Sequence, residues 1–413
     1  MSAMQLVPFA ASASPTSDTA LLSMFWIGCV LVVSPVLVRA SRGLLPDVVV
    51  LLALGCLIGP SVLALAEVGP GVGLVRELGL GLLFLLAGTE IDPATLRARQ
   101  GRQAALTWLL CLVLALGLAW ALIPDESLAA AIVLAIAVTS TALGTLLPIL
   151  KDRGQLDSPL GTSVLTHGAV GELMPVLAMA LLLSTRSTWV SAGVLLAFFA
   201  VAALVAVVPH RLVMRVPGIR AALVEGADTT AQTAIRVTFW LLLTLMAAAS
   251  VFELDVVLGA FAAGFIVRAV RPRGFEAYEE RLEGAAYGFF VPVFFVTSGM
   301  NVDVEAVVEQ PLLLVALLVM ILALRGGPVW LRERFTRTGS GLTEPADRRR
   351  LALYAATGLP IIVAVTELGV ARDLIPGELA AVLVAAGAVT VLVFPFLARP
   401  APATSAAQPG TRR

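Results

Sequence analysis

One stretch of the sequence decides the fold: residues 161–184 read GTSVLTHGAVGELMPVLAMALLLS. The stretch is apolar and long enough to cross the roughly 30 Å hydrocarbon core of a bilayer as a helix. Glu172 stands about 11 residues into it, or roughly 17 Å along a helix that rises about 1.5 Å per residue. That depth places an ionisable carboxyl near the bilayer midplane.

The composition of the whole chain agrees with a membrane protein. Of its 413 residues, 59% are hydrophobic and 14% are charged, and the mean hydropathy is +0.96. Soluble domains are less apolar and carry more charge. The formal net charge is zero, with 28 basic and 28 acidic residues, so the composition indicates no nucleic-acid partner. Cys29, Cys56 and Cys111 lie singly in apolar runs, which predicts packing roles and no metal or other cofactor.

Apolar runs of similar length recur along the chain and predict an all-α polytopic membrane fold. Short polar or Gly- and Pro-containing turns separate these runs. We predict thirteen spans, at residues 20–38, 44–66, 74–91, 104–123, 127–150, 161–184, 188–208, 231–251, 255–270, 285–300, 311–332, 349–368 and 377–398. Residues 1–19 lack a signal-peptide pattern and are expected to form a short extracytoplasmic segment. Residues 20–398 form the transmembrane domain, and 399–413 a short cytoplasmic tail.

The distribution of Lys and Arg supports this division into spans. Alternate loops, together with the C-terminal tail, hold 23 of the 28 basic residues. Because basic residues concentrate in cytoplasmic loops, the N-terminus is predicted outside and the C-terminus inside, as a multi-pass protein of the cell inner (plasma) membrane. In this orientation spans 2–6 and 9–13 form two five-helix blocks that run in opposite senses. Inverted repeats of this kind are typical of secondary transporters.

Glu172 is the main candidate for a functional site. An ionised group inside a span costs several kcal/mol unless it is paired or faces water. Gly168, Gly171 and Pro175 surround it, which favours close helix approach or a local break in the backbone hydrogen bonds. The simpler interpretation is a structural carboxylate, bonded to a hydroxyl or paired with an arginine. The functional interpretation is a carboxyl that holds either a proton or a cation.

Two other spans carry residues that indicate interrupted helices. The span 127–150 contains hydroxyl residues followed by a glycine and a proline, namely Thr139, Ser140, Thr141, Gly144 and Pro148. The span 349–368 contains a counterpart, Thr357, Gly358 and Pro360. Matching Gly and Pro in two repeat halves point to discontinuous helices, whose freed carbonyls can bind a cation. Each residue alone has an ordinary explanation, because Pro, Gly and self-satisfied hydroxyls are common in membrane helices.

Arg325 and His167 also lie inside predicted spans. Arg325 either extends its side chain to the interface or balances a buried carboxylate in the empty site. His167 precedes Glu172 by five residues, so on an ideal helix their side chains point about 140° apart. We interpret His167 either as a satisfied polar residue or as a pH-sensing one.

Several segments together resemble the Kef-type branch of the monovalent cation:proton antiporter-2 family, which has a sodium/hydrogen exchanger-like membrane domain. The resemblance covers nearly the whole chain. It is carried by residues 83–92 (LFLLAGTEID), 139–141 (TST), 150–154 (LKDRG), 159–161 (PLG), 258–264 (LGAFAAG) and 292–300 (PVFFVTSGM).

The resemblance implies a thirteen-helix fold with a dimerisation domain and a mobile core domain, and hence a homodimer. Two crossed, broken helices would carry Thr139 to Thr141 and Thr357 to Pro360. Counted from Gly161, the family's aspartate falls on Glu172, and the aspartate or glutamine before it falls on Gly171. The family's lysine or arginine in the third-last helix falls on Arg325. A single acid with an arginine resembles the electroneutral members.

The sequence therefore predicts a secondary transporter, not an enzyme. We expect it to exchange Na⁺ or K⁺ for H⁺ by alternating access in the lipid bilayer, with Glu172 as the shared site. Thr139, Ser140 and Thr141 would supply oxygen ligands for the transient cation, and Arg325 would stabilise the unloaded site. The alternatives are a non-transporting sensor or membrane enzyme on the same scaffold, and a cation channel. Oxygen ligands accept either cation, so the sequence does not choose between them.

Overall fold

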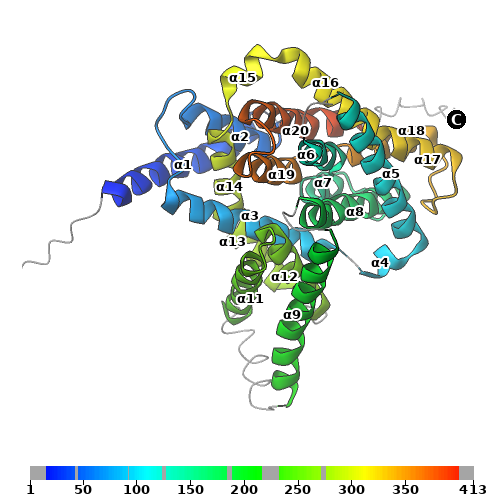
Figure 1. Ribbon diagram of the computed structural model, residues 1–413, viewed down its shortest axis with the longest axis horizontal. Coiled ribbons are helices and arrows are strands. Elements are labelled where there is room, and N and C mark those ends of the chain that lie inside the picture. The colour runs from blue at the N-terminus through cyan, green and yellow to red at the C-terminus, as the bar shows by residue number, and fades with distance from the viewer. Residues whose placement is uncertain are drawn as a thin grey trace, which may run out of the picture. The chain divides into compact units, whose positions relative to one another are not determined.

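The computed structural model describes residues 15–41, 45–91, 93–122, 127–183, 188–215, 232–270 and 276–399. All regular structure within these ranges is helical (Figure 1), which confirms the predicted fold class. Residues 1–14 of the predicted N-terminal segment and 400–413 of the predicted tail lie outside the described ranges.

The chain divides into two compact units. Unit 1 consists of Met1–Thr89, Gly193–Gln310 and Gly377–Ala381, and unit 2 of Glu90–Ala192, Pro311–Pro376 and Val382–Arg413. The helices of unit 1 are α1 (Pro15–Ala40), α2 (Asp47–Ile58), α3 (Pro70–Glu90), most of α9 (Thr188–Arg215), α11 (Gln232–Val251), α12 (Val256–Val270), α13 (Glu276–Ala285), the π-helical turn η1 (Ala286–Phe290), α14 (Val291–Met300) and α15 (Val304–Glu309).

Unit 2 holds the segments that carry Glu172 and both predicted helix breaks. Its helices are α4 (Pro93–Arg97), α5 (Arg99–Leu122), α6 (Leu128–Thr139), α7 (Leu143–Asp152), α8 (Pro159–Leu182), α16 (Pro311–Ile321), the π-helical turn η2 (Leu322–Gly326), α17 (Gly327–Phe335), α18 (Pro345–Ala355), α19 (Pro360–Ala371) and most of α20 (Gly377–Leu397).

Ten of the described helical segments are long and apolar enough to cross a membrane, and three shorter apolar helices accompany them. Each of the thirteen predicted spans overlaps one of these segments. The number of segments that cross a bilayer, and the inverted repeat, remain predictions.

Two predicted spans differ from the helices observed. The span predicted at 44–66 is helical only over Asp47–Ile58, because Gly59-Pro60 follows. Proline disfavours the α conformation of the residue before it, and the Gly59 N–H instead caps the helix on the Gly55 carbonyl at 2.9 Å. The span predicted at 285–300 begins earlier, because α13, η1 and α14 are continuous from Glu276.

Close backbone contact in unit 1 depends on glycine. Helices α2 and α14 pack against each other, and a Cβ on Gly55 would lie 2.1 Å from the Val296 carbonyl oxygen. A Cβ on Gly299 would lie 2.2 Å from the Leu52 carbonyl oxygen. Small residues allow membrane helices to approach in this way.

The centre of unit 2 is formed by the helices that carry the predicted site. In the most apolar windows of Leu128–Leu147 and Pro345–Ala371, 83% of the residues are buried, and 72% are buried in that of Pro159–Leu182. The corresponding value for Arg99–Ala121 is 39%, so α5 lies further from the centre. Helix α19 packs on α6 and α8 (Figure 1), which brings the two predicted breaks toward Glu172.

Candidate functional site

The first break lies between α6 and α7. Ser140 follows the last residue of α6 with an extended backbone, at φ −73° and ψ 161°. The Thr141 N–H donates to the Gly171 carbonyl on α8 at 3.0 Å, and the Ala142 N–H donates to the Thr357 carbonyl at 2.8 Å. These bonds satisfy amides that a continuous helix would have used, as a buried irregular segment requires.

The second break lies between α18 and α19, and it touches the first. Thr357 begins it, Gly358 lies within it and Pro360 is the first residue of α19. A Cβ on Gly358 would lie 2.9 Å from the Ser140 Oγ and 3.0 Å from the Ser140 carbonyl oxygen, so the contact between the breaks requires glycine. Pro148, the other predicted break residue, lies inside α7 beyond the interruption.

The sequence analysis missed a residue of the second break, Thr390 on α20. Its hydroxyl accepts the Gly358 N–H at 3.1 Å and lies 3.0 Å from the Gly358 carbonyl oxygen and 2.7 Å from the Gly387 carbonyl oxygen. Thr390 is fully buried. A lone threonine in an apolar span carries no sequence pattern that could have identified it.

Glu172 lies at the N-terminus of α7. Its Oε1 accepts the Leu143 N–H at 2.6 Å and approaches the Gly144 N–H at 3.4 Å. The residue is 3% exposed, and its Oε2 has no hydrogen-bond partner among the described residues. The unpaired amides and the dipole of a helix N-terminus favour a negative group at this position. One carboxylate oxygen is thus fixed by backbone, whereas the other is available.

Arg325 is buried beside the first break. It lies in the π-helical turn η2, and its Nε and Nη2 donate to the Thr141 Oγ1 at 3.1 and 3.0 Å. Nη2 also donates to the His167 carbonyl at 3.0 Å, and Thr141 donates to the Ala355 carbonyl at 2.6 Å. Among the described residues Arg325 makes no ion pair with Glu172, and its Nη1 has no partner. The Arg325 side chain is 0% exposed and is therefore covered by other parts of the protein.

Gly171 is explained by these contacts. A Cβ at this position would lie 2.4 Å from the Thr141 Oγ1 and 2.7 Å from the Arg325 Nη2. Arg325 and Thr141 therefore occupy the space that a side chain beside Glu172 would need. The sequence alone showed only that a glycine stands here.

The remaining predicted oxygen ligands bond to nearby carbonyls. The Thr139 hydroxyl donates to the Ala135 carbonyl at 2.7 Å, and the Ser140 hydroxyl donates to the Ala137 carbonyl at 2.9 Å. Each hydroxyl oxygen keeps acceptor capacity after donating its proton. The Thr141 hydroxyl differs, because it also accepts two N–H groups from Arg325.

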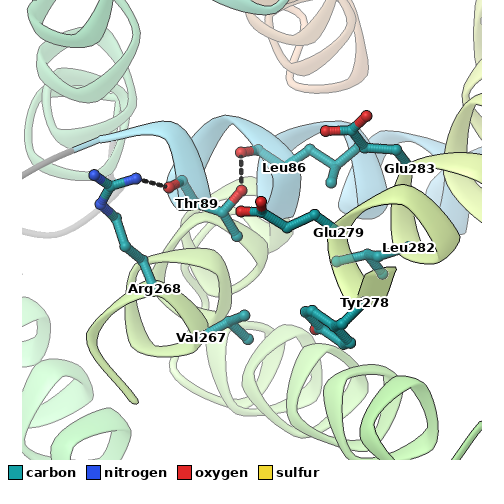
Figure 2. A pocket seen from close by; sticks show the side chains of 8 residues that line it. All are labelled: Leu86, Thr89, Val267, Arg268, Tyr278, Glu279, Leu282 and Glu283. Atoms are coloured by element: carbon teal, nitrogen blue, oxygen red, sulfur yellow. Dashed lines mark hydrogen bonds between the residues drawn. The ribbon is translucent and has the colours of Figure 1, made fainter. Parts of the chain in front are cut away.

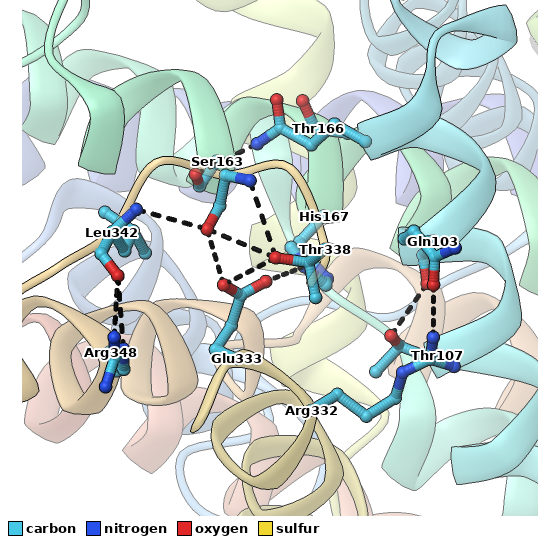
Figure 3. A network of polar contacts seen from close by, with 12 residues as sticks. Gln103, Thr107, Ser163, Thr166, His167, Arg332, Glu333, Thr338, Leu342 and Arg348 are labelled. Carbon is cyan, nitrogen blue, oxygen red and sulfur yellow. Dashed lines mark hydrogen bonds and ion pairs between the residues drawn. The ribbon is translucent and has the colours of Figure 1, made fainter. Parts of the chain in front are cut away.

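His167 does not join Glu172 but meets a second acid. Its Nε2 lies 3.9 Å from the Glu333 Oε1 of α17 (Figure 3). Sequence analysis did not select Glu333, because it stands between Arg332 and Arg334 and resembles part of a solvated charged segment. In the fold Glu333 is buried, at 6% exposure.

Unit 1 contains a small pocket near the C-terminal end of α3 (Figure 2). There the Arg268 Nη1 donates to the Thr89 carbonyl at 2.7 Å, and the Thr89 hydroxyl donates to the Leu86 carbonyl at 2.7 Å. Basic side chains commonly satisfy the last carbonyls of a helix. Arg268 therefore has a structural explanation.

Comparison with known sequences identifies the family. The profile of the family described as "Sodium/hydrogen exchanger, transmembrane" matches residues 28–401. The chain belongs to this family. Exposed large apolar side chains on its apolar helices, such as Trp189 at 88% and Leu312 at 84%, fit contact with lipid. This exchanger-family chain is a multi-pass membrane protein.

Individual relatives agree with the predicted Kef-type resemblance. The chain is 28% identical over 396 residues to the glutathione-regulated potassium-efflux system protein KefC of Klebsiella pneumoniae, covering 92% of this chain and 60% of that protein. It is 24% identical over 333 residues to YjbQ of Bacillus subtilis, whose name assigns it provisionally to the Na⁺/H⁺ antiporters, covering 75% and 52%. The chain thus spans between half and three fifths of these relatives' own length.

A solved structure shares the fold. The sodium proton antiporter MjNhaP1 of Methanocaldococcus jannaschii superposes with a TM-score of 0.61 at 14% identity, covering 91% of this chain and 96% of that one. At this identity the likeness concerns the fold alone.

Proposed function

We propose that this chain exchanges a monovalent cation, Na⁺ or K⁺, for H⁺ by alternating access, and that Glu172 binds both in turn. The observation that carries the proposal is the asymmetry of the Glu172 carboxylate. Backbone amides of α7 hold Oε1, while the buried Oε2 has no partner among the described residues. The family membership and the names of the relatives support cation exchange as the activity.

The free oxygen provides a simple mechanism for competition. A proton on Oε2 leaves the amide bonds to Oε1 intact, and a cation at Oε2 does the same. Burial in a low-dielectric interior favours a neutralised carboxyl, so the negative charge is compensated by one ligand or the other. Because both ligands use one oxygen, binding of the cation displaces the proton.

Thr139 and Ser140 are the proposed hydroxyl ligands of the cation. Each donates to a carbonyl of α6 and retains lone pairs on its oxygen. The Thr141 oxygen already accepts two N–H groups from Arg325, which uses both of its lone pairs. We therefore assign Thr141 to the positioning of Arg325 when the site is empty, with the cation bound by other oxygens.

Arg325 is the proposed permanent charge that balances the empty site. A buried guanidinium is costly without compensation, and Glu172 is a buried acid of the same unit that would balance it when ionised. With a single exchanging carboxyl, one monovalent cation replaces one proton, so we propose electroneutral exchange. In this scheme unit 2 moves relative to unit 1 between inward-open and outward-open states.

The homodimer, the plasma membrane and the orientation with the N-terminus outside belong to the same proposal. The bias of Lys and Arg supports the orientation. Labelling of single cysteines with a membrane-impermeant reagent tests it, since a cysteine near Lys151 should react only from the cytoplasmic side.

The exchange itself is tested in proteoliposomes. Purified protein should move protons in response to gradients of Na⁺ or K⁺, and Glu172→Gln should abolish this movement. Glu378→Gln, which changes an exposed glutamate at the start of α20, is the matched control and should exchange normally. Undiminished exchange by Glu172→Gln would remove Glu172 from its role. Absence of exchange with Na⁺, K⁺ and Li⁺ alike would favour a non-transporting protein on this scaffold.

A further inference from the structure

A second buried acid lies in unit 2, away from the amides that hold Glu172. Glu333 is near the end of α17, and the side chains of Glu333 and His167 are only 2% and 4% exposed. Their nearest charged atoms, the Glu333 Oε1 and the His167 Nε2, are 3.9 Å apart. The His167 Nδ1 is buried without a partner among the described residues. These two side chains form a buried titratable pair (Figure 3).

A loop closes over this pair. The Glu333 Oε2 accepts the Thr338 hydroxyl at 2.9 Å and the Ser340 hydroxyl at 2.5 Å. Gly339 and Gly341 flank Ser340 with φ of +90° and +73°, in the region that glycine adopts without a steric penalty. Both glycines are exposed and Ser340 is half-buried. The half-buried Ser340 hydroxyl and the Glu333 carboxylate thus link the loop to His167.

The charges around His167 make its protonation depend on Glu333. Besides Glu333, two basic side chains lie near His167: the Arg325 Nη2 of η2 donates to the His167 carbonyl at 3.0 Å, and Arg332 precedes Glu333 on α17. Both arginines direct hydrogen bonds to neutral acceptors, Arg332 to the Gln103 side chain and Arg325 to Thr141. Glu333 supplies the opposing negative charge.

We propose that Glu333 and His167 form a second proton-binding site of this chain, which takes its proton from solvent through Ser340. Histidine changes charge between about pH 5 and 8 when unperturbed, and two groups this close titrate as a pair. A charged imidazole beside the carboxylate forms a neutral pair, whereas a neutral imidazole leaves the carboxylate with only its hydroxyl donors. The site thus has two states that differ by one proton.

The pair is connected to the proposed transport site. His167 and Glu172 belong to α8 and are about 7.5 Å apart along its axis. The Arg325 Nη2 donates to the His167 carbonyl and to the Thr141 hydroxyl of the first break. A change at the pair can therefore alter the position of Arg325. This connection rests on the proposed exchange function, whereas proton binding by the pair does not.

Proton binding is tested by NMR of the histidine side chain. The chain has two histidines, His167 and His210, so His210→Gln leaves one imidazole to observe. We expect the His167 signal to titrate, and Glu333→Gln to lower its midpoint by about one pH unit, the size of shift that a close opposite charge produces. Asp347→Asn removes a surface acid paired with Arg350 at 2.8 Å and should leave the midpoint unchanged.

Other outcomes of this experiment overturn the proposal. A His167 signal that keeps one state from about pH 5 to 9, or that has the same midpoint with Gln at 333, contradicts a shared proton site. If Glu333→Gln does not fold, Ser340→Ala replaces it. Loss of this half-buried hydroxyl removes a donor that screens the carboxylate, so the histidine midpoint should then rise, and a midpoint that stays fixed contradicts the proposal.

The transport measurement separates this inference from the proposed function. In proteoliposomes the pH of half-maximal exchange should fall in Glu333→Gln together with the histidine midpoint. Unchanged pH dependence of a robust exchange would overturn the connection to transport. If the wild-type chain exchanges no cation but His167 titrates with Glu333 as expected, the proposed function fails and the second proton site stands.

Discussion

The two helix breaks of unit 2 are built alike but are satisfied by different chemical groups. At the first break a carboxylate, Glu172, binds the amides that begin α7. At the second break a neutral hydroxyl, Thr390, binds the Gly358 amide, and α19 begins with a proline that has no N–H to offer. Only the first break can therefore change its charge. This difference fits our proposal that the first break carries the exchanging group and the second supports it.

The largest effect is expected when the charge beside the first break is removed. Arg325→Ala should reduce exchange more than tenfold, because the empty site then lacks its balancing cation and the Thr141 oxygen loses two donors. Arg325→Lys keeps the charge but not the fork of donors, so it should retain part of the activity. Proteoliposome flux measures both variants. Equal flux in wild type and Arg325→Ala would contradict the claim that the first break, unlike the second, needs a balancing positive charge.

Gly171→Ala should have the next largest effect. Its Cβ would meet the Thr141 Oγ1 and the Arg325 Nη2, and overpacking of this kind costs about 1–3 kcal/mol. We expect flux to fall about tenfold, equivalent to about 1.4 kcal/mol. Gly117→Ala is the matched control, since a Cβ on this helical glycine of the same unit meets no atom within 4 Å. Similar flux in the two alanine variants would contradict the packing of Arg325 against Gly171.

Thr390→Val tests the supporting role of the second break. The substitution leaves the buried Gly358 N–H without its acceptor, at a cost of about 1–3 kcal/mol. The temperature of thermal unfolding should fall, while the cation dependence of the remaining exchange stays unchanged. Thr366→Val is the control, because the Thr366 hydroxyl donates only to carbonyls of its own helix. A changed cation dependence in Thr390→Val would place the second break in the binding site.

Thr139→Val is expected to have the smallest effect. The hydroxyl is one proposed ligand among several oxygens, so the cation concentration for half-maximal exchange should rise a few-fold with little loss of maximal rate. A net difference of about 0.5–1.5 kcal/mol for one hydrogen-bonding group sets this scale. An unchanged concentration would remove Thr139 from the ligand set.

The sequence was sufficient for the parts of this account that follow from local pattern. Apolar length predicted the helical segments, and the depth of Glu172 in its span selected it as the candidate acid. The positions of Gly358 and Pro360 predicted the second break. Gly59-Pro60 shortened α2 against expectation, because the apolar run continues past the residues that end the helix.

Contacts between distant segments could not be predicted in the same way. Thr390 and Glu333 acquire their roles only when α20 meets the second break and α17 meets α8. Arg325 was selected, but its contacts with Thr141 and the His167 carbonyl depend on the π-helical turn that orients it. Gly171 had no explanation until the side chains that fill its place were known.

The central claim is that a proton and a cation compete for the free oxygen of Glu172. It is tested most directly by adding NaCl or KCl to purified protein in weakly buffered detergent solution and measuring the protons released. The account predicts release of about one proton per chain with the transported cation, because one carboxyl is shared, and none from Glu172→Gln. Choline chloride should release none from either protein. Equal release from wild type and Glu172→Gln would contradict the claim.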